Sequence, residues 1–197
     1  MTTIDFTGNT VGLIVRGKTG PTHVPGNMEQ HADCVLPDGS PIGFFGEDGA
    51  NTGGSARQGS WNKSGMNLKG AVYDHYMLSI HRPYYIDAAS AKTYNVKSTL
   101  LVIDITPQFA SLFVDYWRRL KASPKGFNIL GANCSTRASS AFVYAKLLSN
   151  GIPGLDTPDN LYRQLVVERK GKTKSYSGYI GFTKKASGGY SVLIDVP

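Results

Sequence analysis

Two cysteines and four histidines are the side chains through which this chain of 197 residues could carry out nucleophilic chemistry. Cys134 stands in "GANCSTRASS", where a glycine-containing stretch gives way to small and apolar residues. A thiol at a helix N-terminus lies at the positive end of the helix dipole, which lowers its pKa and stabilises the thiolate. Ser135 and Thr136 are potential caps for such a helix. The stretch is therefore compatible with a nucleophile at Cys134, beside backbone N–H groups that could hold an oxyanion.

A structural role for the thiol is the alternative. Cysteine is among the most buried residue types, and a single cysteine in an apolar helix is usually a small core residue. This interpretation suits Cys34, which lies inside a predicted strand. For Cys134 the local sequence leaves both interpretations open.

A catalytic thiol also needs a base, and only the histidines offer one near neutral pH. His31 begins the predicted strand "HADCVL", where strand pairing can hold a side chain rigidly, and it is the preferred base. His23 lies in a predicted proline-rich loop and is the reserve candidate. His75 and His81 lack an identifiable third metal ligand, so structural roles are expected for them.

The partner strand of His31 is expected to supply a third residue that orients its imidazole. "PDGS" at 37–40 predicts a tight turn between two strands within 31–49. A turn at Asp38 and Gly39 places Gly46 opposite His31, and Asp33 and Phe44 on the same face as His31.

Two acidic residues after this hairpin are candidates for the third position. In the predicted register Asp48 lies on the face of His31 and Glu47 points the other way. A bulge at Gly46 would exchange them, so Asp48 ranks ahead of Glu47. Either could equally be a solvated turn residue.

The segments that must position these residues alternate between strand and helix patterns. Strands are predicted at 10–17, at 31–49 as a hairpin, within 71–90 and at 97–106, and two or more antiparallel strands at 166–197. Helices are predicted from Pro107, capped by Thr106; from the Cys134 region to Asn150-Gly151; and over 157–165, capped by Thr157. Residues 50–70, rich in Gly, Ser and Asn, are predicted to form a long loop insertion containing Trp61.

Composition indicates one soluble, folded α+β domain spanning residues 1–197. Hydrophobic residues make up 41% of the chain and charged residues 18%, which disfavours a disordered chain. The formal net charge of +7 favours anionic partners. No apolar run is long enough to span a membrane, and the first residues lack the pattern of a classical signal peptide, so synthesis in the cytoplasm is expected.

Two segments resemble parts of a known family. "QHADCVLPDGSPIGFFGEDG" resembles the histidine hairpin of circularly permuted papain-like hydrolases of the NlpC type. "TPQFASLFVDYWRRL", followed by "FNILGANCSTRASSAFVYAKLLSNGI" and "TPDNLYRQL", resembles their cysteine half. Permuted members place the histidine strand before the cysteine helix, as His31 precedes Cys134 here. The third polar position is not cleanly matched, and residues 50–70 have no counterpart.

The resemblance implies an antiparallel sheet packed against helices, one of which carries the cysteine. It implies Cys134 as nucleophile, His31 as general base and acid, and no cofactor or metal. The expected function is hydrolysis of amide bonds in bacterial peptidoglycan through an acyl-enzyme. Because some relatives are secreted antibacterial toxins, the resemblance also raises delivery to a target periplasm by a system such as type VI secretion, with a carrier and an immunity protein as partners.

Two other functions stay open, and a third is less favoured. A lipid-directed acyl hydrolase or acyltransferase would use the same two residues, and a phospholipid suits the basic charge almost as well as a wall polymer does. A non-catalytic binding domain would keep Cys134 as a core thiol. Nucleic-acid binding is not expected, because the basic segment "ERKGKTK" lacks interleaved aromatic residues.

Overall fold

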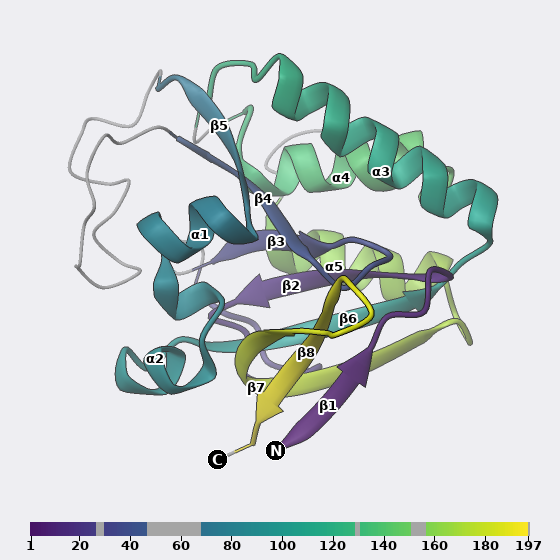
Figure 1. Ribbon diagram of the computed structural model, residues 1–197. Helices are drawn as coiled ribbons and strands as arrows, with labels where there is room; N and C mark the ends of the chain where they lie inside the picture. Colours follow the sequence, from purple (N-terminus) through teal and green to yellow (C-terminus); the bar gives the residue numbers. More distant parts are fainter. Residues whose placement is uncertain (27–29, 47–67, 129–130, 151–156, 197) are drawn as a thin grey trace.

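The computed structural model describes residues 1–26, 30–46, 68–128, 131–150 and 157–196, which form a mixed α+β structure with an antiparallel eight-stranded sheet and five α-helices (Figure 1). The strands are β1 Thr2–Asp5, β2 Thr10–Arg16, β3 His31–Val35, β4 Pro41–Gly46, β5 Gly70–Asp74, β6 Lys97–Asp104, β7 Thr173–Lys184 and β8 Tyr190–Asp195. The helices are α1 His75–His81, α2 Ala88–Thr93, α3 Pro107–Ala122, α4 Cys134–Tyr144 and α5 Pro158–Glu168, with the 3₁₀ turn η1 Pro83–Tyr85. The predicted α+β class is confirmed.

The sheet follows the order β1-β8-β7-β6-β2-β3-β4-β5, with every neighbouring pair antiparallel. β1 pairs with β8, which brings the two ends of the chain to the same edge of the sheet (Figure 1). The histidine strand β3 lies between β2 and β4, so backbone pairing holds it on both sides.

Helices α3, α4 and α5 cover one face of the central strands. Their apolar side chains join residues of β2, β3, β4 and β6 in the largest hydrophobic cluster, which includes Leu13, Cys34, Phe113, Phe142 and Leu161. The Phe113 and Phe142 rings, from α3 and α4, pack 5.0 Å apart between centroids. This cluster fixes the cysteine helix α4 against the histidine strand β3.

The other face of the sheet is covered in two ways. Strands β7 and β8 contribute Ile180 and Val192 to a second cluster with Ile14 of β2 and Leu100 of β6, so the sheet curls over its own central strands. Around η1 and α1, a third and largely aromatic cluster packs beside β4 and β5; its buried members are Phe45, Tyr73, Leu78, Tyr84, Tyr85 and Val96. Burial on both faces explains why β2 and β4 read as near-continuous apolar runs.

The predicted helix starts agree with the structure at two places. Thr106 caps α3, where its side chain accepts from the N–H of Phe109, and Pro107 is the first helical residue. Thr157 caps α5 in the same way, accepting from the N–H of Asn160. A hydroxyl cap followed by proline is a strong start signal because proline lacks only an N–H that the first turn leaves unpaired anyway.

Three predictions of secondary structure are wrong. The strands expected within 71–90 stop at Asp74, whose carboxylate accepts from the N–H of Met77 and starts α1. The helix beginning at Cys134 ends at Tyr144, not at Asn150-Gly151, because Lys146 takes a positive φ of 58°. The strand β1 was not predicted, since its four residues are mostly exposed and carry no apolar pattern.

The predicted hairpin register is wrong by one residue. The strands pair Asp33 with Gly43 and Cys34 with Ile42. The turn is closed by Leu36 and Ser40 and uses a positive φ at Gly39. A shift of one residue exchanges the two faces of the partner strand, so Phe44 lies on the face opposite to that of Asp33.

Among the described residues, no helix combines the length and apolar character needed to cross a bilayer. The Gly, Ser and Asn-rich loop predicted at 50–70 lies almost entirely outside the described residues.

Truncating Phe142 should destabilise the protein strongly, because its ring is fully buried between α4 and α3. We expect Phe142→Ala to lower the free energy of unfolding by about 3 to 5 kcal/mol, measured by urea denaturation. Val167→Ala, at a side chain that is 74% exposed, is the control and should change it by less than about 0.5 kcal/mol. Similar losses for both variants would contradict the assigned core.

Candidate active site

Cys134 is the first residue of helix α4. Its cap is Asn133, whose side-chain oxygen accepts from the N–H of Thr136 at 3.0 Å and from the hydroxyls of Ser135 and Thr136, each at 3.0 Å. Ser135 and Thr136, proposed from the sequence as caps, instead donate to this cap. The asparagine therefore fixes where the helix begins, and with it the position of the thiol.

The structure brings Cys134 and His31 together. His31 is the first residue of β3, and its imidazole lies close enough to the Cys134 thiol for each group to shift the pKa of the other through charge and hydrogen bonding. The backbone N–H of Ala32 also hydrogen-bonds Cys134. Both residues are mostly covered: Cys134 is 8% exposed and the His31 side chain 15%. Because little of either side chain contacts water, charge interactions within the pair are strengthened.

Asp33 orients the imidazole. His31 Nε2 lies 2.8 Å from Asp33 Oδ1, which leaves Nδ1 as the ring nitrogen for the thiol. The two residues are separated by one position on β3, so their side chains leave the strand on the same face. Asp33, on the same strand as His31, therefore takes the role of the third residue, which was predicted to come from the partner strand.

Asp33 is held in turn by Arg16. The Arg16 Nε donates to Asp33 Oδ2 at 2.8 Å, Nη2 donates to the carbonyl of Tyr85 at 2.9 Å, and the guanidinium lies 4.4 Å from the centre of the Tyr85 ring. Arg16 and Asp33 are buried, with 1% and 0% of the side chains exposed. The guanidinium balances the carboxylate and fixes its rotamer.

Gly43 leaves the space that the Asp33 carboxylate fills. It is the cross-strand partner of Asp33 on β4, and a Cβ added there would lie 2.4 Å from Asp33 Oδ1 and 2.9 Å from the Phe45 ring. Any side chain at this position would have to displace the carboxylate or the ring. Gly43 is thus part of the geometry although it has no side chain.

The pKa values of His31, Cys134 and Asp33 depend on one another. Burial alone would lower the pKa of His31, but the negative charges of Cys134 and Asp33 outweigh it and raise that pKa to about 9. Burial would raise the pKa of Cys134, yet the His31 charge and hydrogen bond, with the N–H of Ala32, hold it below its usual range. The pKa of Asp33 is lowered against its burial by His31 and Arg16. At neutral pH these shifts favour a thiolate beside an imidazolium.

The other predicted candidates do not join this group in the described structure. Asp48 and Glu47 lie outside the described residues. His23, the reserve base, accepts from the N–H of Thr19 through Nδ1 in an exposed turn. The His75 ring stacks on Tyr190 and the His81 ring on Tyr73, with centroids 4.4 and 4.9 Å apart.

Four residues of the site were not assigned to it from the sequence: Asp33, Arg16, Gly43 and Asn133. Asp33 carried a usable signal, because a carboxylate two residues from a histidine in a strand must share its face. Arg16 and Gly43 carried none, since their roles depend on strand pairings that join distant segments. No group of three His, Cys, Asp or Glu suited to a metal ion occurs among the described residues.

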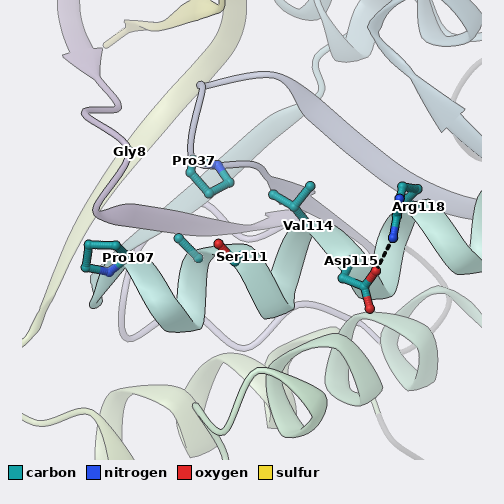
Figure 2. A pocket seen from close by; sticks show the side chains of 8 residues that line it. Gly8, Pro37, Pro107, Ser111, Val114, Asp115 and Arg118 are labelled. Carbon is teal, nitrogen blue, oxygen red and sulfur yellow. Dashed lines mark hydrogen bonds and ion pairs between the residues drawn. The ribbon is translucent and has the colours of Figure 1, made fainter.

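A surface hollow lies away from the thiol, beside helix α3 (Figure 2). It is lined by Gly8, Pro37, Pro107, Ala110, Ser111, Val114, Asp115 and Arg118. Asp115 pairs with Arg118 and also accepts from the hydroxyl of Tyr144, the last residue of α4. Cys134, at the other end of α4 from Tyr144, is not among the residues that line this hollow.

A scan of protein-family models found no match for the chain, and searches of curated proteins and of solved structures also found none.

Adding a methyl group at Gly43 should disturb the site without removing any of its functional groups. We expect Gly43→Ala to push the Asp33 carboxylate from His31 and to slow alkylation of Cys134 at pH 6 by about tenfold, the equivalent of about 1.4 kcal/mol in thiolate stabilisation. Iodoacetamide kinetics followed by mass spectrometry measure this rate. Gly131→Ala, where an added Cβ meets nothing within 4 Å, is the control and should keep the wild-type rate. An unchanged rate in Gly43→Ala would show that the carboxylate does not need this space.

Proposed function

We propose that the protein is a cysteine hydrolase that cleaves an amide bond through an acyl-enzyme. The observation that carries this proposal is the placement of the largely covered His31 imidazole between the Cys134 thiol and the Asp33 carboxylate. A core thiol needs none of these partners. A nucleophile needs all of them: a base within hydrogen-bond reach, and a third group that orients the base.

In the first half of the proposed reaction, the Cys134 thiolate attacks the carbonyl carbon of the substrate. The resulting oxyanion lies at the start of α4, where the N–H of the first helical residue has no acceptor within the helix. The His31 imidazolium then donates its proton to the leaving nitrogen, the C–N bond breaks and a thioester remains on Cys134. Asp33 keeps the imidazole aligned and stabilises its positive charge.

The second half of the reaction reverses the role of His31. The neutral imidazole takes a proton from water, the hydroxide attacks the thioester, and the C–S bond breaks to release the acid. Cys134 leaves as a thiolate and His31 is again an imidazolium. One histidine therefore serves as acid and then as base, which requires a pKa that the two neighbouring anions can tune.

The proposed substrate is bacterial peptidoglycan. Its support is the resemblance of the two chain segments to permuted papain-like hydrolases of the NlpC type, together with the net charge of +7, which favours an anionic polymer. A cysteine helix packed on a sheet whose histidine strand comes earlier in the chain is compatible with that permuted fold. Delivery as an antibacterial toxin, with a carrier and an immunity protein, belongs to the same proposal.

The reactivity of the thiol tests the catalytic part of the proposal. In wild type, Cys134 should be alkylated by iodoacetamide at pH 6 at least tenfold faster than free cysteine, because the imidazolium keeps it ionised below its usual pKa. His31→Ala should remove this excess. Cys34→Ala leaves Cys134 as the sole thiol and should keep the fast alkylation of the wild type. This result would exclude Cys34 as the reacting group. A wild-type rate no faster than that of free cysteine would end the catalytic proposal.

Product analysis tests the substrate. Purified sacculi incubated with the protein should release diaminopimelate-containing peptides, and Cys134→Ala should release none. kcat/KM should rise as the thiol ionises and fall again near pH 9, because His31 then loses the proton that the leaving nitrogen needs. Release of fatty acid from phospholipid liposomes, with intact sacculi, would replace the wall substrate with a lipid.

A further inference from the structure

The ring of Phe45 lies flat against the imidazole of His31. Their centroids are 4.3 Å apart and their planes differ by 25°. β3 pairs Asp33 with Gly43, and in an antiparallel pair the position two residues earlier on β3 faces the position two residues later on β4. His31 and Phe45 are therefore cross-strand neighbours on one face, and the corrected register is what places them together.

Phe45 cannot easily move away from the imidazole, because a second ring supports it. Tyr73 of β5 stacks on Phe45 with centroids 4.7 Å apart and planes 17° apart, and Tyr73 stacks in turn on His81 of α1. Phe45 is 6% exposed and Tyr73 2%. The stack thus runs from the histidine strand across two further strands to a helix.

The contact supplies a restraint that the hydrogen bonds of His31 do not. Asp33 and Cys134 bind the imidazole through atoms in the plane of the ring. Two in-plane bonds fix the ring edge but allow it to tilt about the line that joins them. A flat surface against one face removes this tilt, and proton transfer to a leaving group depends on the direction of the N–H bond.

We propose that Phe45 is a positioning residue that fixes the tilt of the His31 imidazole and, through the negative face of its ring, favours the protonated form. This inference rests on the proposed function. It adds to the site a residue whose side chain cannot itself act as acid, base or nucleophile. The electrostatic part follows from the aromatic quadrupole, whose negative face attracts a cation placed over it.

The charged and titratable groups around His31 belong to other residues, so a substitution of Phe45 removes none of them. They are Asp33, on the same strand as His31, and Cys134, at the start of α4. Arg16 on β2 binds Asp33, and the ring centre of Tyr85 in η1 is 5.6 Å from that of the imidazole. Burial raises the pKa of Tyr85, so this phenol is neutral over the range of the test. A change in His31 titration on replacing Phe45 therefore reports the ring contact.

The test is an NMR titration of histidine side chains labelled with ¹³C in the whole protein. The chain has four histidines, and His31→Gln assigns the signal of interest. Phe45→Leu keeps an apolar side chain without a flat ring, and we expect it to lower the His31 midpoint by about half a pH unit or more. With the proposed substrate, kcat should fall about tenfold with KM little changed, because the loss affects proton transfer and not binding.

Two further variants keep the test decisive. Phe44→Leu removes a ring of the same size from the adjacent position of β4, which packs on the opposite face against Phe127, and should leave the His31 midpoint unchanged. Phe45→Tyr retains the flat ring and should have the same His31 titration midpoint as the wild type. If Phe45→Leu does not fold, Phe45→Met provides the same loss of a flat ring with a more adaptable side chain.

An equal His31 midpoint in wild type and in Phe45→Leu or Phe45→Met would overturn the inference. So would an equal shift in Phe44→Leu, because it would point to loosening of the strand and not to the ring contact. These outcomes are separate from failure of the proposed function, which would show in the wild-type protein as a Cys134 that reacts no faster than free cysteine.

Discussion

The partly buried hydrogen bond between His31 and Asp33 is the interaction on which the arrangement of the site depends. A carboxylate without solvent is costly unless it is paired, and Asp33 is paired on both sides, by the imidazole and by the guanidinium of Arg16. Together with the Cys134 thiolate, these groups form a row of alternating charge. Removing any of these side chains leaves a neighbouring charge without its partner, so we expect the loss of one to disturb the positions of the others.

Three elements distant in the chain must meet to build this row. β2 supplies Arg16, β3 supplies His31 and Asp33, and α4 supplies Cys134. Strand pairing sets the distance between the first two elements, while the large apolar cluster presses α4 onto the sheet. Arg16 pairs directly with His31 across the strands and reaches the diagonal neighbour Asp33, a contact that long side chains make readily.

Two helix caps and most strands could be predicted because their signals are local. Thr106 and Thr157 precede prolines, and the apolar run 10–17 has no other reasonable structure. The roles of Arg16 and Gly43 could not be predicted, since they depend on which strands pair and in which register. The one-residue error in the hairpin affects only the ranking of Asp48 ahead of Glu47. Asp33 lies two residues from His31 on the same strand and therefore shares its face in either register.

The two cysteines show that burial alone does not decide what a thiol can do. Both are buried, and for both desolvation raises the pKa. At Cys34 the charge of the adjacent Asp33 adds to this effect, so the thiol stays protonated within the apolar cluster. At Cys134 the His31 imidazole outweighs the effect of burial, lowers the pKa of the thiol and favours the thiolate. The charge of Asp33 by itself disfavours ionisation of both thiols. Its favourable effect on the Cys134 thiolate therefore acts through His31, because Asp33 stabilises the positive charge of the imidazolium beside the sulfur.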